Sequence, residues 1–318
     1  MSDQSFVGID VSKDKLDVHV RPSDHSRSFV YDEEGLEQLI SALQIVQPRI
    51  ETIIVEATGG YERRLVAVLV AEQLPVVVVN PQRVRYFAKA TGQLAKTDAI
   101  DAAVLSMFGL TLRPQARELP DQSLEDLRDL LARRRQIVAM ITAEKNRLTT
   151  AVRKSIRREI QDHIHWLTKR LKSTDDELNR NIQASSVWKA KDDLLQGVPG
   201  IGPVSATSLL IQLPELGTLN RHQIAALVGI APINQDSGRF KGHRITQGGR
   251  ASVRSVLYMC TLVATKHNPA IRDFYRRLVQ SGKPKMLALV ASMRKLLTIL
   301  NTMLKHNRAW DASYAKTS

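Results

Sequence analysis

The sequence is poor in cysteine and aromatic residues and has no long uninterrupted apolar run. One cysteine in 318 residues excludes an internal disulfide and fits a reducing compartment. Aromatic residues make up 5% of the chain, so we assign them to core or interface rather than to stacking on bases. No apolar run reaches about 18 residues, so we expect no membrane span. The opening residues, MSDQSFVGID, lack the pattern of a secretory signal.

What the chain has in excess is positive charge. Its 46 Lys and Arg residues outnumber 32 Asp and Glu residues, giving a net charge of +14. Such an excess is typical of proteins with a polyanionic partner, most often nucleic acid. The charge is uneven: residues 1–110 hold 11 basic and 15 acidic residues, and residues 111–318 hold 35 and 17. Acidic residues in such a protein often hold a divalent cation, although chance joining of two domains is the alternative.

Short apolar strands alternate with helices over the first 110 residues. The spacing predicts strands at 5–11, 15–20, 28–31, 52–56 and 75–79. Helices are predicted at 33–46, 61–72 and 98–110, with another from about residue 82. This order implies an α/β domain with a mixed sheet and parallel crossovers.

From residue 121 the pattern becomes that of long helices. Leu, Ile and Val recur at three- and four-residue steps from 124 to 178, and no proline lies between Pro120 and Pro199. The pattern predicts long, coiled-coil-like helices and leaves open an intermolecular coiled coil or an internal two-helix hairpin. The basic stretch 133–172, which begins with Arg133, Arg134 and Arg135, is a predicted track for phosphate backbones.

The remaining residues predict an all-helical unit that contains one glycine-rich turn. VPGIGP, at 198–203, resembles a helix-hairpin-helix turn, in which Gly200 and Gly202 leave backbone N–H groups free for phosphate. A packing turn between two helices is the alternative. We therefore expect three segments: a catalytic domain at 1–115, a basic helical region at 116–192 and a helical domain at 193–318.

A polar stretch between two helices of the last segment, residues 232–247, contains Ser237. A serine before a glycine indicates by itself only a turn. Four nearby cations are predicted to hold a phosphate and neutralise charge that develops on it. They are Arg239, Lys241, Arg244 and Arg250.

Four carboxylates fall near the ends of predicted strands and at a helix start. Asp10 lies in the first strand, Glu56 ends the fourth, and Asp98 and Asp101 share one face of a helix. A carboxylate in an apolar strand is costly unless it is paired or metal-bound, although each acid alone can be structural. Because oxygen ligands suit Mg²⁺ or Mn²⁺, the four together predict a metal site for phosphoryl transfer.

The segments VGIDVSKDKLDV, IIVEATGGYE and KTDAIDA resemble the RNase H-like nuclease fold, in particular its RuvC-like branch. With NPQRVRYFAKATGQLAKTDAIDA and VPGIGPVSA, nearly the whole chain closely resembles the DEDD transposases of insertion sequences, which are bridge-RNA-guided serine recombinases. The resemblance implies that Asp10, Glu56, Asp98 and Asp101 bind Mg²⁺ and that Ser237 attacks the scissile phosphate, forming a phosphoserine intermediate. Ser237 matches the family's nucleophile because it precedes a Gly-Gly turn and the helix containing LYM.

The resemblance also implies partners and a location. They are double-stranded donor and target DNA, and a structured non-coding guide RNA that pairs with both. Dimers are expected to pair into a tetramer, with the two halves of a site coming from different protomers. The expected location is the bacterial cytoplasm, in association with the nucleoid.

Two other functions fit part of the sequence. A RuvC-like endonuclease that resolves Holliday junctions needs the carboxylates and metal, but uses water instead of a serine. A non-catalytic nucleic-acid-binding scaffold needs only the basic helices and the glycine-rich turn. The acidic set argues against the scaffold, because a simple binder gains nothing from an acidic pocket.

Overall fold

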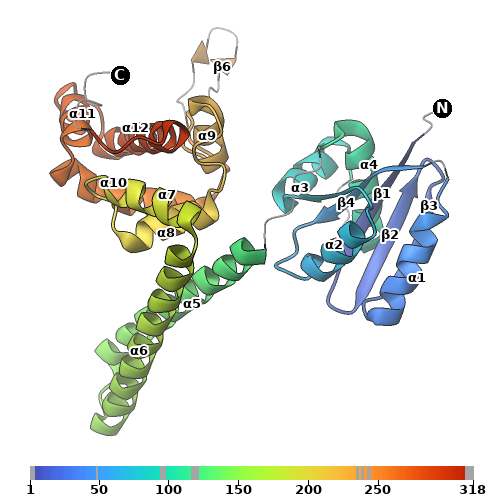
Figure 1. Ribbon diagram of the computed structural model, residues 1–318, viewed down its shortest axis with the longest axis horizontal. Coiled ribbons are helices and arrows are strands. Elements are labelled where there is room, and N and C mark those ends of the chain that lie inside the picture. Colours follow the sequence, from blue (N-terminus) through green and yellow to red (C-terminus); the bar gives the residue numbers. More distant parts are fainter. Residues whose placement is uncertain are drawn as a thin grey trace. The chain divides into compact units, whose positions relative to one another are not determined.

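The computed structural model describes residues 4–47, 49–93, 98–115, 122–233, 236–237, 240–241 and 245–311 (Figure 1). Contacts divide the chain into two compact units, Met1–Leu119 and Pro120–Ser318. The N-terminal unit is a sheet with helices on both faces, and the C-terminal unit is mostly helical. The expected α/β domain and helical C-terminal region are confirmed, and the division into three segments stays a prediction.

One mixed sheet forms the centre of the N-terminal unit. In the described part of this unit it has five strands, in the order β3-β2-β1-β4-β5. Strand β1 is antiparallel to β2 and parallel to β4, β2 is antiparallel to β3, and β4 is parallel to β5. The strands are β1 (Ser5–Val11), β2 (Lys15–Arg21), β3 (His25–Val30), β4 (Ile50–Glu56) and β5 (Val76–Val79).

Helices cover both faces of this sheet (Figure 1). They are α1 (Glu33–Gln44), α2 (Glu62–Ala71), α3 (Pro81–Ala90) and α4 (Asp98–Leu112). Apolar residues of α1 and α2 pack with Ile9 and Val55 on one face, whereas those of α3 and α4 pack with Ile54 on the other. This alternation follows from the two-residue period of a strand. It makes the face under α4 distinct from the face under α1 and α2.

The C-terminal unit combines a helical bundle with a long helical hairpin. The hairpin consists of α5 (Gln122–Thr150) and α6 (Lys154–Ala184). The bundle consists of α7 (Ser186–Gln196), α8 (Pro203–Gln212), α9 (Arg221–Val228), α10 (Ala251–His267), α11 (Pro269–Gln280) and α12 (Lys285–His306). Two short strands, β6 (Asp236–Ser237) and β7 (Phe240–Lys241), lie between α9 and α10.

Helices α5 and α6 fold back on each other within one chain, which is the internal hairpin of the two expected arrangements. Ile137 and Ile141 of α5 pack against Leu167 of α6 in the middle of the hairpin. At the turn that joins the helices, the Arg157 guanidinium donates to the carbonyl oxygen of Leu148 at 2.9 Å. The hairpin therefore has its own apolar seam.

Helix α12 forms much of the core of the bundle. Among the described helices, it is the one that is long and apolar enough to cross a membrane, by length and composition alone. Arg294 and Lys295 interrupt the apolar run and hid it from a search for uninterrupted apolar residues. Because 56% of its apolar window is buried inside the protein, α12 is explained as a core helix.

Candidate active site

Asp10 and Glu56 lie side by side at the carboxyl ends of two parallel strands. Asp10 is the second-last residue of β1 and Glu56 the last of β4. The register pairs Ile9 with Val55. The residue that follows each of them, Asp10 on β1 and Glu56 on β4, therefore stands level with the other and points to the same face of the sheet. Both acidic side chains are half-buried. The sheet therefore brings together two predicted carboxylates that are 46 positions apart in the sequence.

Helix α4 lies directly on this face because Gly8 has no side chain. A Cβ atom on Gly8 would lie 2.1 Å from the carbonyl oxygen of Ala102 and 2.4 Å from the amide nitrogen of Ser106. Farther along α4, a Cβ atom on Gly109 would lie 3.5 Å from the ring of Phe6, which comes two residues before Gly8 on β1. The two contacts show that α4 runs antiparallel to β1. Its first turn therefore lies toward the carboxyl ends of β1 and β4.

The first turn of α4 carries the other two predicted carboxylates. Asp101 is half-buried and adjoins Ala102, whose backbone contacts Gly8. From the contact between Gly8 and Ala102, Asp10 lies two strand residues farther, which is about 6.6 Å, and one turn of α4 covers about 5.4 Å. The first turn of α4 therefore reaches about the level of Asp10. Asp98 is the first residue of α4, and its side chain lies outside the described part of the structure.

The chemistry of this edge fits a hard divalent cation. Carboxylate oxygens are the donors that Mg²⁺ and Mn²⁺ prefer, and Asp10 and Glu56 stand level at this edge, with the first turn of α4 toward it. Among the side chains that the structure describes, no three His, Cys, Asp or Glu groups are close enough to form a metal site. The described residues thus locate single carboxylate donors at this edge, but they do not form a complete set of metal ligands.

Asp17 is another carboxylate at this edge, and it was not among the predicted site residues. It pairs directly with Asp10 across the antiparallel strands β1 and β2, so both side chains point to the α4 face. Asp17 is buried, accepts a hydrogen bond from the Ser28 hydroxyl and lies 2.8 Å from the Lys15 ammonium. A cavity of about 150 Å³ adjoins Asp17 and Ala102. The sequence contains no signal for Asp17, because its alternation with apolar residues is equally typical of a strand with one face open to solvent.

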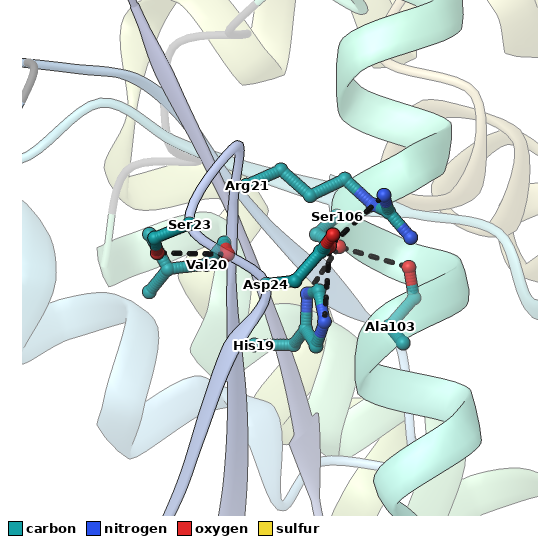
Figure 2. A network of polar contacts seen from close by, with 7 residues as sticks. All are labelled: His19, Val20, Arg21, Ser23, Asp24, Ala103 and Ser106. Atoms are coloured by element: carbon teal, nitrogen blue, oxygen red, sulfur yellow. Dashed lines mark hydrogen bonds and ion pairs between the residues drawn. The ribbon is translucent and has the colours of Figure 1, made fainter.

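His19 ties the sheet to α4 through a buried polar network (Figure 2). Its Nδ1 lies 2.8 Å from the Ser106 hydroxyl oxygen, and that hydroxyl donates to the carbonyl oxygen of Ala103. The Nδ1–H group therefore donates to Ser106. On the other side, Nε2 lies 3.7 Å from a carboxylate oxygen of Asp24, which also pairs with Arg21 at 3.1 Å. Burial and then the Arg21 charge lower the pKa of His19, which Asp24 opposes, so the neutral ring is favoured.

Ser237 lies in a tight two-stranded hairpin of the C-terminal unit. Its backbone pairs with Phe240, and Asp236 pairs with Lys241. An isolated bridge between Ile233 and Ile245 continues the pairing toward the bundle. The side chains of Ser237 and Lys241, and the whole of Arg239 and Arg244, lie outside the described residues. Their predicted roles stay predictions.

Glycines hold together the two ends of the segment that carries Ser237. A Cβ atom on Gly229 would lie 2.1 Å from the carbonyl oxygen of Gly248, and one on Gly249 would lie 2.3 Å from the amide nitrogen of Gly229. All three have positive φ angles, which favour glycine. The Arg254 guanidinium donates to the carbonyl oxygens of Val228 and Gly248 and braces the contact. We call this contact between Gly229, Gly248 and Gly249 the glycine clasp.

Arg250, which was predicted to hold a phosphate, is held by an acidic residue of its own unit. Its two terminal nitrogens each lie 2.6 Å from an oxygen of Glu215, and one also donates to the carbonyl oxygen of Gln212 at 2.9 Å. A bidentate pair of this kind fixes the guanidinium. The geometry gives Arg250 a structural role at the start of α10.

The three predicted arginines of α5 have different surroundings. The Arg134 Nε lies 2.6 Å from an oxygen of Asp175 and links α5 to α6. Arg133 and Arg135 are exposed. The exposed pair therefore offers charge to solvent, whereas Arg134 stabilises the hairpin.

The glycine-rich turn between α7 and α8 packs closely on the bundle. Gly200 has a φ of 107°, and a Cβ atom there would lie 2.9 Å from the Ala264 side chain of α10. Nothing lies within 4 Å of such an atom on Gly202. Packing thus explains Gly200, while Gly202 leaves room at the start of α8. Phosphate binding by this turn stays a prediction.

Two family models match the chain. The model for the DEDD transposase of IS110, described as a transposase, matches residues 7–156. A second, described as a transposase of the IS116/IS110/IS902 family, matches residues 192–276. The first range includes all four predicted carboxylates, and the second includes Ser237.

Relatives of the chain come from several bacteria. The chain is 27% identical over 316 residues to the pilin gene-inverting proteins of Moraxella lacunata and Moraxella bovis, covering 97% of this chain and 98% of each relative. It is also 27% identical over 145 residues to a 44.8 kDa protein of insertion element IS116 from Streptomyces clavuligerus, covering 45% of this chain and 35% of that protein. Together with the two matching models, these similarities show that the chain belongs to the IS110 family of insertion-sequence transposases.

Proposed function

We propose that this transposase is an RNA-guided recombinase that cuts and rejoins DNA through a phosphoserine intermediate. The observation that carries the proposal is that Asp10 and Glu56 stand level at the ends of two parallel strands, with the first turn of α4, which carries Asp101, toward the same edge. A site for metal-assisted phosphoryl transfer needs such an acidic edge, and a basic protein that only binds nucleic acid does not. The guide RNA, the donor and target DNA and a tetramer of the chain are part of the proposal through the family resemblance.

The topology of the N-terminal unit supports an RNase H-like, RuvC-like fold. Three antiparallel strands, β3, β2 and β1, continue into two parallel strands, β4 and β5. The proposed active site uses the end of β1, the end of β4 and the first turn of α4. Carboxyl ends of parallel strands meet at one edge, where the side chains of successive crossovers can act together.

The proposed chemistry divides between the two units. Asp10, Glu56, Asp98 and Asp101 would hold Mg²⁺ or Mn²⁺, which when bound polarises the scissile phosphate and neutralises its charge. The Ser237 oxygen attacks the phosphorus, so that a serine–phosphate bond forms and the bond to the leaving sugar oxygen breaks. The serine proton is lost and the leaving oxygen gains one. Attack by a sugar hydroxyl of another strand reverses these steps and rejoins the DNA.

Cations near Ser237 would assist the attack. Arg239, Lys241 and Arg244 follow it within seven residues and would hold the phosphate while negative charge grows on it. Arg250 would act differently, because its bond to Glu215 fixes the start of α10 instead. The proposal therefore assigns phosphate contacts to three of the four predicted cations.

A second candidate function rests on the acidic edge alone. A RuvC-like nuclease that resolves Holliday junctions would use the same carboxylates and a metal-activated water, without a serine. The two candidates differ in one product. The recombinase leaves DNA joined to protein, whereas the nuclease leaves free DNA ends.

The deciding experiment incubates labelled DNA with protein, Mg²⁺ and RNA transcribed from the DNA that flanks the coding region. Denaturing electrophoresis should show a protein–DNA adduct, and peptide mapping should locate it on Ser237. Ser237→Ala should remove both the adduct and the cleavage. Ser173→Ala, at an exposed serine of α6, is the matched control and should behave as the wild type. Cleavage by Ser237→Ala with no adduct would show that water is the nucleophile.

A further inference from the structure

A groove of about 1210 Å³ in the C-terminal unit lies outside the site described above. Residues of α9, α11 and α12 line it, together with Pro232 and Ile245 from the two stems of the Ser237 segment. We call it the α12 groove. Its position means that anything bound there lies beside the stems that carry the candidate nucleophile.

The α12 groove is rich in cations. From residue 274 to residue 310 the chain has eight basic residues and no acidic one, and two of the eight, Arg294 and Lys295, line the groove. Arg221, Arg294 and Lys295 line the groove, and within the described ranges no carboxylate forms an ion pair with any of them. Cations gathered without anions repel one another, so the groove favours an anionic occupant.

Lys295 is held in place inside this groove. Its ammonium nitrogen lies 4.8 Å from the centre of the Phe274 ring, and Arg277 lies 5.3 Å from the same centre. Burial and then the Arg277 charge lower the pKa of Lys295. A partly desolvated cation beside another cation gains much from a bound anion. The ring thus positions Lys295 for a ligand.

The start of α12 lines the groove with apolar side chains that are open to solvent. Met286 is 60% exposed and Leu287 is 51% exposed, and both line the groove beside Val290. Exposed apolar side chains that adjoin uncompensated cations fit a ligand with a flat apolar part and a negative charge. An unpaired nucleotide has both, whereas a duplex hides the faces of its bases in its own stack.

We propose that the α12 groove binds an unpaired nucleotide of a nucleic-acid strand. Its base lies against Met286 and Leu287, and its phosphodiester group contacts Arg294 and Lys295. The proposal deepens the proposed function, since it rests on nucleic acid being the substrate of this transposase. It requires neither metal nor Ser237, so binding tests it separately from the chemistry.

The test measures binding of a single-stranded oligonucleotide that carries the fluorescent base 2-aminopurine to the full chain without metal. Met286→Ser with Leu287→Ser should weaken binding five- to tenfold and leave the salt dependence unchanged. Arg294→Gln with Lys295→Gln should weaken binding and flatten the salt dependence by about 0.7 for each cation that no longer meets a phosphate. Duplex of the same sequence should respond to either pair less than twofold.

Matched controls separate the groove from the rest of the surface. Met259→Ser changes a methionine that is also 60% exposed but lies on α10, and Lys266→Gln removes an exposed cation of that helix. Both should bind the oligonucleotide as the wild type does. Circular dichroism checks that every variant is folded.

Two outcomes would overturn the proposal. One is that the groove variants fold and bind single strands as tightly as the controls do. The other is that the groove variants lower the mass of the protein in light scattering, which would make the groove an interface between copies of the chain. If the groove variants weaken binding and no adduct forms on Ser237, the proposed serine chemistry is wrong and the proposed nucleotide site is retained.

Discussion

Gly8 and Ala102 are in contact through their backbones, since a Cβ atom on Gly8 would lie 2.1 Å from the Ala102 carbonyl oxygen. The contact lies two residues before Asp10 on β1 and one residue after Asp101 on α4. The absence of one side chain therefore sets how near the two carboxylates can come.

Gly8→Ala should push α4 away from β1. It should lower the free energy of unfolding of the N-terminal unit by about 3 kcal/mol, which is at the upper end for a methyl group added to a packed core. DNA cleavage should fall more than tenfold, because Asp101 moves with the helix. Gly92→Ala is the control, since Gly92 has a φ of 80° but nothing within 4 Å of a Cβ atom. It should cost about 1 kcal/mol from backbone strain and keep cleavage. Urea unfolding and a cleavage assay measure both effects, and equal behaviour of the two variants would contradict the role of Gly8.

Asp10→Asn, Glu56→Gln and Asp101→Asn should each reduce DNA cleavage more than a hundredfold while leaving the protein folded. Each substitution removes a charged oxygen donor from a metal site and keeps the shape of the side chain. Glu51→Gln, at an exposed position of β4, should cleave as the wild type does. Thermal melts and cleavage in Mg²⁺ or excess chelator provide the measurement. Full activity of Asp10→Asn, or undiminished cleavage in chelator, would reject the metal site.

The arginines of α5 should separate binding from stability. Arg133→Ala with Arg135→Ala removes two exposed cations, so DNA or RNA binding should weaken across sequences and lose about two units of salt dependence. Arg134→Ala removes the partner of Asp175 and should instead destabilise the hairpin by about 1 kcal/mol. Anisotropy titrations at several salt concentrations and urea unfolding distinguish the two. A salt dependence unchanged by the double variant would locate the contacts elsewhere.

His19 should make the N-terminal unit less stable in mild acid. The histidine of the unfolded chain titrates near pH 6.5, about its ordinary value, and the pKa in the folded protein is lower. Above about pH 6.5 both states are neutral and stability is complete. As the pH falls below that value the unfolded state takes up a proton first, so stability falls until the folded pKa is passed.

His19→Asn should flatten this loss, because its amide can donate to Ser106 without titrating. Unfolding by urea at pH values from 7 to 5 gives the slope. His25→Asn, at an exposed histidine of β3, is the matched control. The assignment to His19 fails if His19→Asn retains the wild-type slope.

The strands that hold the candidate site were predictable from local pattern. VGIDV and TIIVE are short apolar runs that each include a carboxylate, and carboxyl ends of parallel strands meet at one edge. Strand β3 begins at His25 and not at the predicted Ser28, because its exposed residues before Phe29 carry no apolar alternation. Edge strands show the pattern weakly, since only one side packs.

Other parts could not be predicted because their partners are far away in the sequence. Asp17 and His19 alternate with apolar residues, which is typical of a strand with one solvent face, yet α4 covers them. Arg250 looked like a free cation because Glu215 lies 35 positions earlier. Local charge patterns do not reveal such pairs.

The glycine clasp joins the two ends of the Ser237 segment between α9 and α10. Residues 230–247 begin and end at the clasp, so we expect a change in length beyond the Ile233–Ile245 bridge to leave α9 and α10 in place. Doubling the length of a flexible loop adds only about 0.6 kcal/mol of closure entropy. The candidate nucleophile therefore lies on a segment whose length can change, whereas the carboxylates Asp10 and Glu56 are part of the sheet. We expect that this segment can be replaced by one of another length or sequence without a change in the strands that carry Asp10 and Glu56.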